Sequence, residues 1–185
     1  MKSKIQELIV RAKAYRKKKN YKKAIEILKE AHEIGVSSKA LRDLVDVHNQ
    51  LMLIYYLIQN PEDFEKSFEF ARTLAVKIGY NKGLVEALMN KAWIEAENRK
   101  FLDAITHASD ALSIDAILES ASALTTALYI ISEANFAVGD AQKGQRFKEL
   151  YLKNMVKLSA QEEEQIRKIH QLSKKISKEE EIDLR

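Results

Sequence analysis

The chain has 185 residues, of which 46% are apolar and 31% are charged, a balance typical of a folded globular protein. With 5 Gly and 1 Pro it has too few turn residues for a sheet protein, and the lack of Cys excludes disulfides, thiolate zinc sites and a cysteine nucleophile. The net charge is +4, but residues 1–38 carry 11 basic and 4 acidic side chains. These values predict a helical protein with a basic N-terminal end.

The first expected element is a pair of antiparallel helices over about residues 3–34, joined by a turn at Lys19 and Asn20. One face of its second helix carries small or apolar side chains at steps of three and four, which mark a single helical face. These residues are Tyr21, Ala24, Leu28 and Ala31. Small side chains on that face let a neighbouring helix approach closely, so we expect Ala24 to be buried.

The same pattern recurs three times, which predicts further helix pairs over about 39–78, 82–114 and 118–157. The copies are Phe64, Ser67, Ala71, Leu74; then Phe101, Ala104, Ala108, Ala111; then Ala141, Gly144, Lys148, Tyr151. Aligned in this way, the copies recur at an uneven interval, with Ser67, Ala104 and Gly144 as the counterparts of Ala24. We expect Ala104 and Ala108 to be buried at helix contacts.

Helix boundaries are marked by capping and turn residues. Asn60 suits a cap and Pro61 the first position of the helix that follows it. Gly35 and Gly79 are expected just past the ends of second helices, where a left-handed residue commonly closes a helix.

A last helix is predicted over 159–178, because Ser159 and Glu162 form a capping box. It carries one apolar stripe, of Ile166, Ile169, Leu172 and Ile176, as expected of an element that covers the open end of a stack. Residues 179–185 are expected to be a frayed tail. The predicted fold class is therefore all-α, with four antiparallel helix pairs in residues 1–158 and a capping helix.

The residues of the first pair, Leu8, Ala12 and Tyr15 followed by Tyr21, Ala24, Leu28 and Ala31, resemble the signature of the tetratricopeptide-repeat (TPR) family. The family period is 34 residues, whereas this chain averages about 40. That longer variant resembles the repeat domains of bacterial peptide-sensing regulators and of kinesin light chains. The resemblance implies a right-handed superhelical solenoid whose first helices line a concave groove for extended peptides or partner helices.

The predicted groove consists of one strip on each first helix, chosen at steps of four, three and four along the chain. Its residues are Lys13, Lys17, His48, Met52, Tyr55, Gln59, Glu86, Asn90, Trp93, Glu97, Tyr129 and Glu133, and Gln6, Val10, Thr126 and Phe136 complete the strips. Trp93 and Tyr55 are expected to be apolar anchors, since such residues are frequent at binding hot spots. The alternative is that both simply pack between repeats.

No pattern in the chain points to catalysis, a metal or a cofactor. The four histidines do not share a helical spacing of three or four, and neither a phosphate-binding loop nor a Gly-x-Ser-x-Gly nucleophile motif is present. The short segment from Gly79 to Gly83 is expected to be a connector between helices. We therefore predict a protein that is not an enzyme, with no catalytic, cofactor-binding or metal-binding residues.

The leading functional prediction is a module that binds a protein or peptide. The alternative is a peptide-sensing regulatory domain that controls a separate output protein. A third interpretation, a nucleic-acid or anionic-surface adaptor, rests on the basic cluster around Arg11 to Lys23. The run from Leu51 to Ile58 is apolar on every side, so its helix is expected to be central or to meet a second copy in a homodimer.

A membrane partner is not expected, because the apolar run from Leu51 to Ile58 is far shorter than the roughly 20 residues that a membrane span needs. The first residues also lack the apolar segment of a signal peptide. Together these features predict a cytoplasmic protein.

Overall fold

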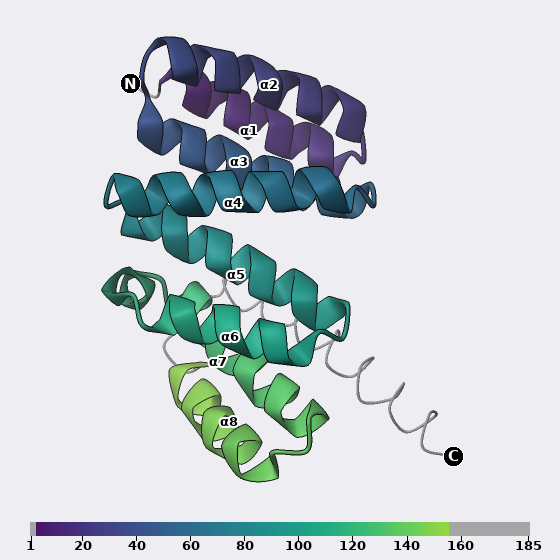
Figure 1. The fold of residues 1–185 in the computed structure, drawn as a ribbon, viewed down its shortest axis with the longest axis vertical. Coiled ribbons are helices and arrows are strands. Elements are labelled where there is room, and N and C mark those ends of the chain that lie inside the picture. Colours follow the sequence, from purple (N-terminus) through teal and green to yellow (C-terminus); the bar gives the residue numbers. More distant parts are fainter. Residues whose placement is uncertain (1–2, 156–185) are drawn as a thin grey trace. The chain divides into compact units, whose positions relative to one another are not determined.

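The computed structural model describes residues 3–155, and the regular structure of that range is entirely helical, as expected. The helices are α1 (Lys4–Lys17), α2 (Tyr21–Ser37), α3 (Leu41–Leu57), α4 (Pro61–Lys77), α5 (Asn81–Glu97), α6 (Phe101–Leu112), the 3-10 helix η1 (Asp115–Glu119), α7 (Ala121–Ala137) and α8 (Ala141–Met155) (Figure 1). Within these residues no helix is long and apolar enough to cross a membrane. The predicted capping helix over 159–178 and the tail over 179–185 lie outside the described residues.

The α-helices from α2 to α8 begin at equal intervals along the chain, and we call this regular spacing the constant frame. Their first residues are Tyr21, Leu41, Pro61, Asn81, Phe101, Ala121 and Ala141. The uneven interval taken from the sequence is therefore wrong. When Tyr21 is matched to Pro61, Phe64 rather than Ser67 is equivalent to Ala24. The pattern of small or apolar residues admits either register, because Phe64 is apolar and Ser67 is small, and both side chains are buried on α4.

Most connections between helices share one turn, in which a left-handed residue follows the helix. These residues are Lys19, Lys39, Gln59, Gly79, Arg99 and Gly139, with φ between 55° and 88°. The next amide then donates to the carbonyl five positions back, as Tyr80 N does to Ala75 O at 2.8 Å. This is the Schellman arrangement, and it confirms the expected position of Gly79.

Other boundary predictions had mixed outcomes. Asn60 caps α4 by accepting from the amide of Asp63 at 3.2 Å, and Pro61 is the first helical residue, as predicted. Gly35, however, lies inside α2, where an added Cβ would be 2.7 Å from Cδ2 of Leu44. Its missing side chain lets α2 approach α3. The segment from Gly79 to Gly83 is also only partly a connector, because α5 begins at Asn81.

The chain divides into two compact units, residues 1–90 and 91–185, with the boundary inside α5. In unit 1, α1 packs against α2 and α3, and α3 packs against both α2 and α4. Ala24 and Ala31 are fully buried, which confirms the prediction for Ala24 and allows the close approach of their neighbours.

In unit 2, α7 packs against both α6 and α8. Ala104 and Ala108 are fully buried, as predicted. Helix α6 ends early, at Leu112, where the hydroxyl of Ser113 donates to the carbonyl of Asp110 at 2.6 Å. The chain then forms η1, whose Ile117 is only 1% exposed and anchors the connection to α7 in the core.

Candidate functional site

A set of polar side chains in unit 1 links α1, α3 and the first turns of α5, and we call it the polar face. It comprises Gln6, Lys13, Arg16, Asp43, Asp46, Gln50, Tyr80 and Glu86. The side-chain amide of Gln6 donates to Asp43 at 2.5 Å and to Asp46 at 3.2 Å. The hydroxyl of Tyr80 donates to Asp46 at 3.2 Å, so Asp46 receives donors from both neighbouring segments.

A second chain of hydrogen bonds crosses the polar face. Arg16 Nη1 donates to Gln50 Oε1 at 3.3 Å, and Gln50 Nε2 donates to Glu86 Oε1 at 3.1 Å. Below this chain, the buried amide of Asn49 donates to the backbone carbonyl of Gly83 at 3.0 Å. These bonds hold side chains from three helices in fixed orientations.

Burial controls the electrostatics of the polar face. It raises the pKa of Glu86, with a further increase from Asp46 nearby, while Lys13, Lys82 and Arg16 oppose the shift. Burial also raises the pKa of Asp46 and lowers the pKa of Arg16. The face therefore holds partly desolvated charges of both signs, whose interactions are stronger than those of fully hydrated charges.

The constant frame corrects the predicted groove strip on α3. Lys19 and Gln59 are the left-handed residues that follow α1 and α3, and matching them places Asp46 and Gln50 where Gln6 and Val10 lie on α1. Both Asp46 and Gln50 belong to the polar face. The predicted strip, His48, Met52, Tyr55 and Gln59, starts two positions later. The error follows from the wrong register assumed for the second copy.

The residues of that predicted strip are not available as an open groove wall. Met52 is fully buried, and Tyr55 is 9% exposed, which favours the alternative that Tyr55 packs between helices. Gln59 is the left-handed residue of the turn after α3. His48 contacts α2 rather than α1, because its Nε2 lies 3.1 Å from Nδ1 of His32.

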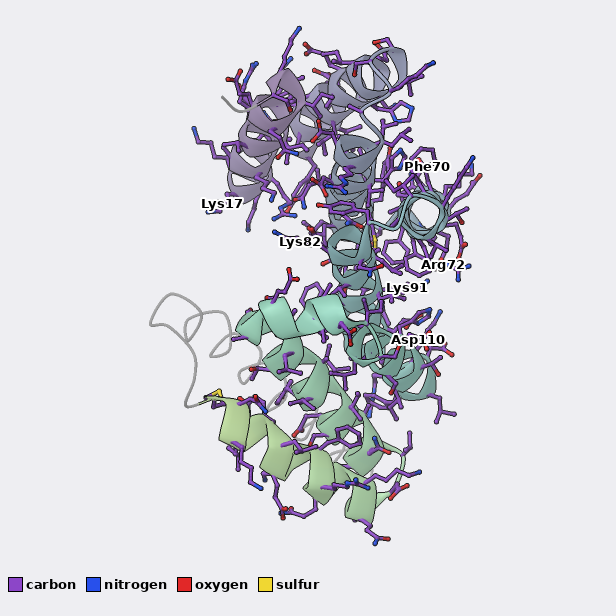
Figure 2. All side chains as sticks on the ribbon, turned by 90° about the vertical axis from the view of Figure 1, so that its left-hand side faces the viewer. Lys17, Phe70, Arg72, Lys82, Lys91 and Asp110 are labelled. Atoms are coloured by element: carbon purple, nitrogen blue, oxygen red, sulfur yellow. The ribbon has the colours of Figure 1, made fainter. Side chains whose placement is uncertain are left out.

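On α1, the predicted residues Lys13 and Lys17 are both exposed; Lys13 belongs to the polar face and Lys17 lies at its edge. Figure 2 shows Lys17 and Lys82 on one side of unit 1, opposite Phe70 and Arg72 of α4. On α5, Glu86 belongs to the polar face. The side-chain nitrogen of Asn90 is buried and has no hydrogen-bond partner within residues 3–155.

The remaining predicted residues lie in unit 2. Trp93, Glu97 and Glu133 are partly buried. Tyr129 is 7% exposed, and its ring centre lies 5.4 Å from that of Tyr151, so it belongs to the core between α7 and α8. Burial, followed by the nearby charge of Glu133, raises the pKa of Tyr151 to about 12.

Two histidine clusters were missed by the sequence analysis. In unit 2, His107 Nδ1 lies 2.7 Å from Glu95 Oε2, and Lys91 Nζ lies 3.6 Å from the other oxygen of this buried carboxylate. In unit 1, His32 and His48 meet as described above. No spacing rule could find these pairs, because each joins residues of different helices. In the described part of the chain, no group of three or more His, Asp or Glu side chains is placed to hold a metal ion.

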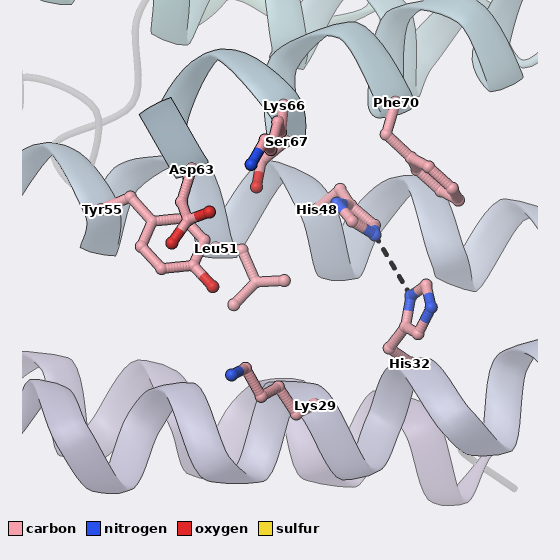
Figure 3. Close-up of a pocket in the computed structure, with 9 residues that line it drawn as sticks. All are labelled: Lys29, His32, His48, Leu51, Tyr55, Asp63, Lys66, Ser67 and Phe70. Carbon is pink, nitrogen blue, oxygen red and sulfur yellow. Dashed lines mark hydrogen bonds between the residues drawn. The ribbon is translucent and has the colours of Figure 1, made fainter. Parts of the chain in front are cut away.

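A pocket of about 290 Å³ lies beside His48, between α2 and α4 (Figure 3). Its lining includes Lys29, Leu51, Tyr55 and Phe70. The ring of Phe70 stacks on His48 with centres 3.9 Å apart and 24° between the planes. Two residues of the predicted groove, His48 and Tyr55, thus line this pocket instead.

Comparisons with known proteins bear on the fold alone. No protein-family model and no curated protein matches the chain. One similar solved structure is BtubC (BKLC) from P. vanneervenii, with a TM-score of 0.71 and 16% sequence identity. The match covers 82% of this chain and 63% of the BtubC chain, so this chain spans less than two thirds of that protein. At this identity the similarity indicates a shared helical fold.

Proposed function

We propose that the chain is a TPR-like solenoid that acts as a non-enzymatic, cytoplasmic protein-interaction module. Its binding surface is the polar face of unit 1 together with Lys17 at its edge, and its ligand is an acidic peptide segment or partner helix. The observation that carries the proposal is the hydrogen-bonded chain from Arg16 through Gln50 to Glu86.

This chain of contacts supports binding because its polar groups are already oriented. A surface whose side chains are held by neighbours loses less conformational entropy when a ligand arrives, which favours affinity. Asp43 and Asp46 are engaged by Gln6 and Tyr80, while Lys13 and Lys17 remain accessible at the edge. The accessible charge is therefore basic, and it complements acidic side chains.

The test is a selection of randomised peptides displayed on phage, with the full chain immobilised. We expect enriched sequences to carry Asp or Glu. The double variant Lys13→Glu, Lys17→Glu should weaken the best peptide about tenfold or more, equivalent to about 1.4 kcal/mol. Affinity should also fall moderately with salt, because exposed charges are screened.

A matched control is the double variant Lys22→Glu, Lys148→Glu, which changes the net charge equally at exposed positions outside the polar face. It should change affinity by less than about twofold. If both double variants weakened peptide binding equally, the loss of affinity would be due to the change in net charge and not to the polar face. That result, or a failure to enrich any peptide, would refute the proposal.

A further inference from the structure

The pocket between α2 and α4 lies on the side of unit 1 that carries Phe70, away from Lys17 and Lys82 (Figures 2 and 3). Its volume of about 290 Å³ is just below the range of typical small-molecule sites, roughly 300–1,000 Å³. A space of this size suits one amino-acid side chain or a free molecule of similar size.

Three hydrogen-bond donors line this pocket: the ammonium group of Lys29 and the hydroxyls of Tyr55 and Ser67. Within residues 3–155, no hydrogen bond or ion pair engages any of the three side chains. Burial, followed by the nearby charge of Asp63, raises the pKa of Tyr55, so its hydroxyl remains protonated and can donate. Donors of this kind, one of them charged, match the two oxygens of a carboxylate.

The other charged groups of the lining have hydrogen-bond partners, although the amide that Asp63 engages is neutral and leaves the negative charge of Asp63 beside Tyr55. Lys66 pairs with Glu62 at 2.6 Å, and the side chain of Asp63 accepts from the side-chain amide of Asn60 at 2.8 Å. Among the described lining residues, Lys29 is therefore the cation that an anionic ligand can engage without displacing an existing partner. It enters from α2, whereas the two hydroxyls come from α3 and α4 (Figure 3).

Leu51 and Phe70 form the apolar part of the wall. Leu51 is 4% exposed, and Phe70 is 37% exposed with its ring fixed against His48. His48 adds no charge, because burial and the neighbouring His32 lower its pKa to about 4. An apolar group can thus pack against Leu51 and Phe70 beside the neutral ring of His48.

We propose that this pocket binds an apolar carboxylic acid of about one side chain in size, with its carboxylate on Lys29, Tyr55 and Ser67. The same chemistry is offered by a free apolar acid and by the C-terminal residue of a peptide ending in a large apolar side chain. The site is separate from the polar face, so it goes beyond the proposed function and does not depend on it.

The experiment uses four probes on the full chain and follows backbone amide shifts by ¹H–¹⁵N NMR. The probes are N-acetyl-L-phenylalanine, its amide, and the peptide Gly-Ser-Gly-Ser-Phe with a free or an amidated C-terminus. The free acids should shift amides around Ser67 and His48, with a Kd on the order of 0.1–1 mM, as expected for small ligands. The amides should bind at least tenfold more weakly.

Two variants and a control locate the site. Lys29→Met keeps the aliphatic stem and removes the charge, so it should weaken the acid about tenfold. Ser67→Leu fills the pocket and should abolish the shifts, with thermal melting as a check on folding. Lys22→Met removes an exposed lysine of the same helix outside the pocket and should leave binding unchanged.

The outcomes separate the two sources of ligand. Binding of N-acetyl-L-phenylalanine but not of the peptide acid supports a free acid, whereas binding of both supports a C-terminal residue. Equal binding of acids and amides would overturn the proposal, as would the absence of shifts around Ser67 at tenfold the expected Kd. Unchanged affinity of a folded Lys29→Met variant would also overturn it.

Discussion

The two units place partly buried histidines in opposite electrostatic environments. In unit 1, His48 contacts His32 and Phe70, and burial is the main cause of its pKa falling to about 4. In unit 2, the hydrogen bond with Glu95 raises the pKa of His107 even though burial opposes the charge. The comparison shows that burial alone does not decide the charge of a histidine on a helix, because one carboxylate at 2.7 Å reverses the direction of the pKa shift.

The units also differ in how a second helix returns to the next first helix. In unit 1, α2 runs to Ser37 and a single left-handed residue, Lys39, leads into α3. In unit 2, α6 is shorter than α2 and ends at Leu112. The 3-10 helix η1 occupies part of the remaining segment, so that α7 still begins at the position that the constant frame requires. Both units keep the equal spacing of helix starts. Of the two connections compared, that of unit 2 contains a buried residue, Ile117, which anchors it to the core.

The largest expected effect concerns this connection. Ile117→Ala should lower the free energy of unfolding by about 2–5 kcal/mol, because it opens a cavity beneath η1. Lys77→Ala changes the equivalent exposed position in unit 1 and should cost no more than about 0.5 kcal/mol. Urea unfolding of both variants measures the difference, and similar midpoints would show that η1 does not anchor unit 2.

The next effect is the acid sensitivity of unit 1. Because the folded-state pKa of His48 is about 4 and the unfolded value about 6.5, its stabilisation is complete above pH 6.5 and is lost as the pH falls toward 4. The loss can reach about 3 kcal/mol. His48→Phe keeps an aromatic ring beside Phe70 and cannot titrate. Urea unfolding from pH 4.5 to 7 should show a shallower pH dependence for this variant, and identical slopes would contradict the assignment.

In unit 2 the pH dependence of stability has the opposite sign, because the pKa of His107 is raised rather than lowered. Because the pKa of His107 is raised, the stabilisation from its contact with Glu95 is complete below pH 6.5 and is lost as the pH rises through the raised value. Glu95→Gln should remove this alkaline loss, which we expect to be about 1 kcal/mol. Unfolding at pH 6 and pH 9 measures it, with the exposed Glu149→Gln as control; a loss that persists in Glu95→Gln would have another origin.

The smallest effects test the shared turn. Lys39 adopts a left-handed conformation that costs a residue with a Cβ about 1 kcal/mol, so Lys39→Gly should raise the thermal midpoint. Gly79→Ala changes an equivalent turn in the opposite direction and should lower it by a similar amount. If both substitutions move the midpoint the same way, the turns do not control helix ends as described.

Much of the fold could be predicted because its signals are local. The cap at Asn60 and the small faces at Ala24, Ala104 and Ala108 depend on residues within one or two turns of each other. The candidate site was predicted less well, because a shift of two positions on α3 replaces Asp46 by His48. The apolar Phe64 and the small Ser67 both fit a pattern of small or apolar residues, so the register could not be read from α4.

The features that were missed depend on contacts between helices. His32 and His48 lie on α2 and α3, and Glu95 and His107 on α5 and α6, so neither pair has a recognisable helical spacing. The 3-10 helix η1 was also missed, whereas the end of α6 at Leu112 lies within two residues of the predicted end at 114. Such contacts follow from packing, which a periodic pattern does not contain.

The equal spacing of helix starts has a consequence for how this protein can change over generations. Because the helix-plus-turn segments from α2 to α7 have the same length, gain or loss of one complete pair leaves the remaining helices meeting through turns of unchanged geometry. Recombination between copies would then produce chains of different length without inventing a new connection. The irregular junction at η1 is the exception, and it marks the point at which such an exchange would require a matching buried side chain.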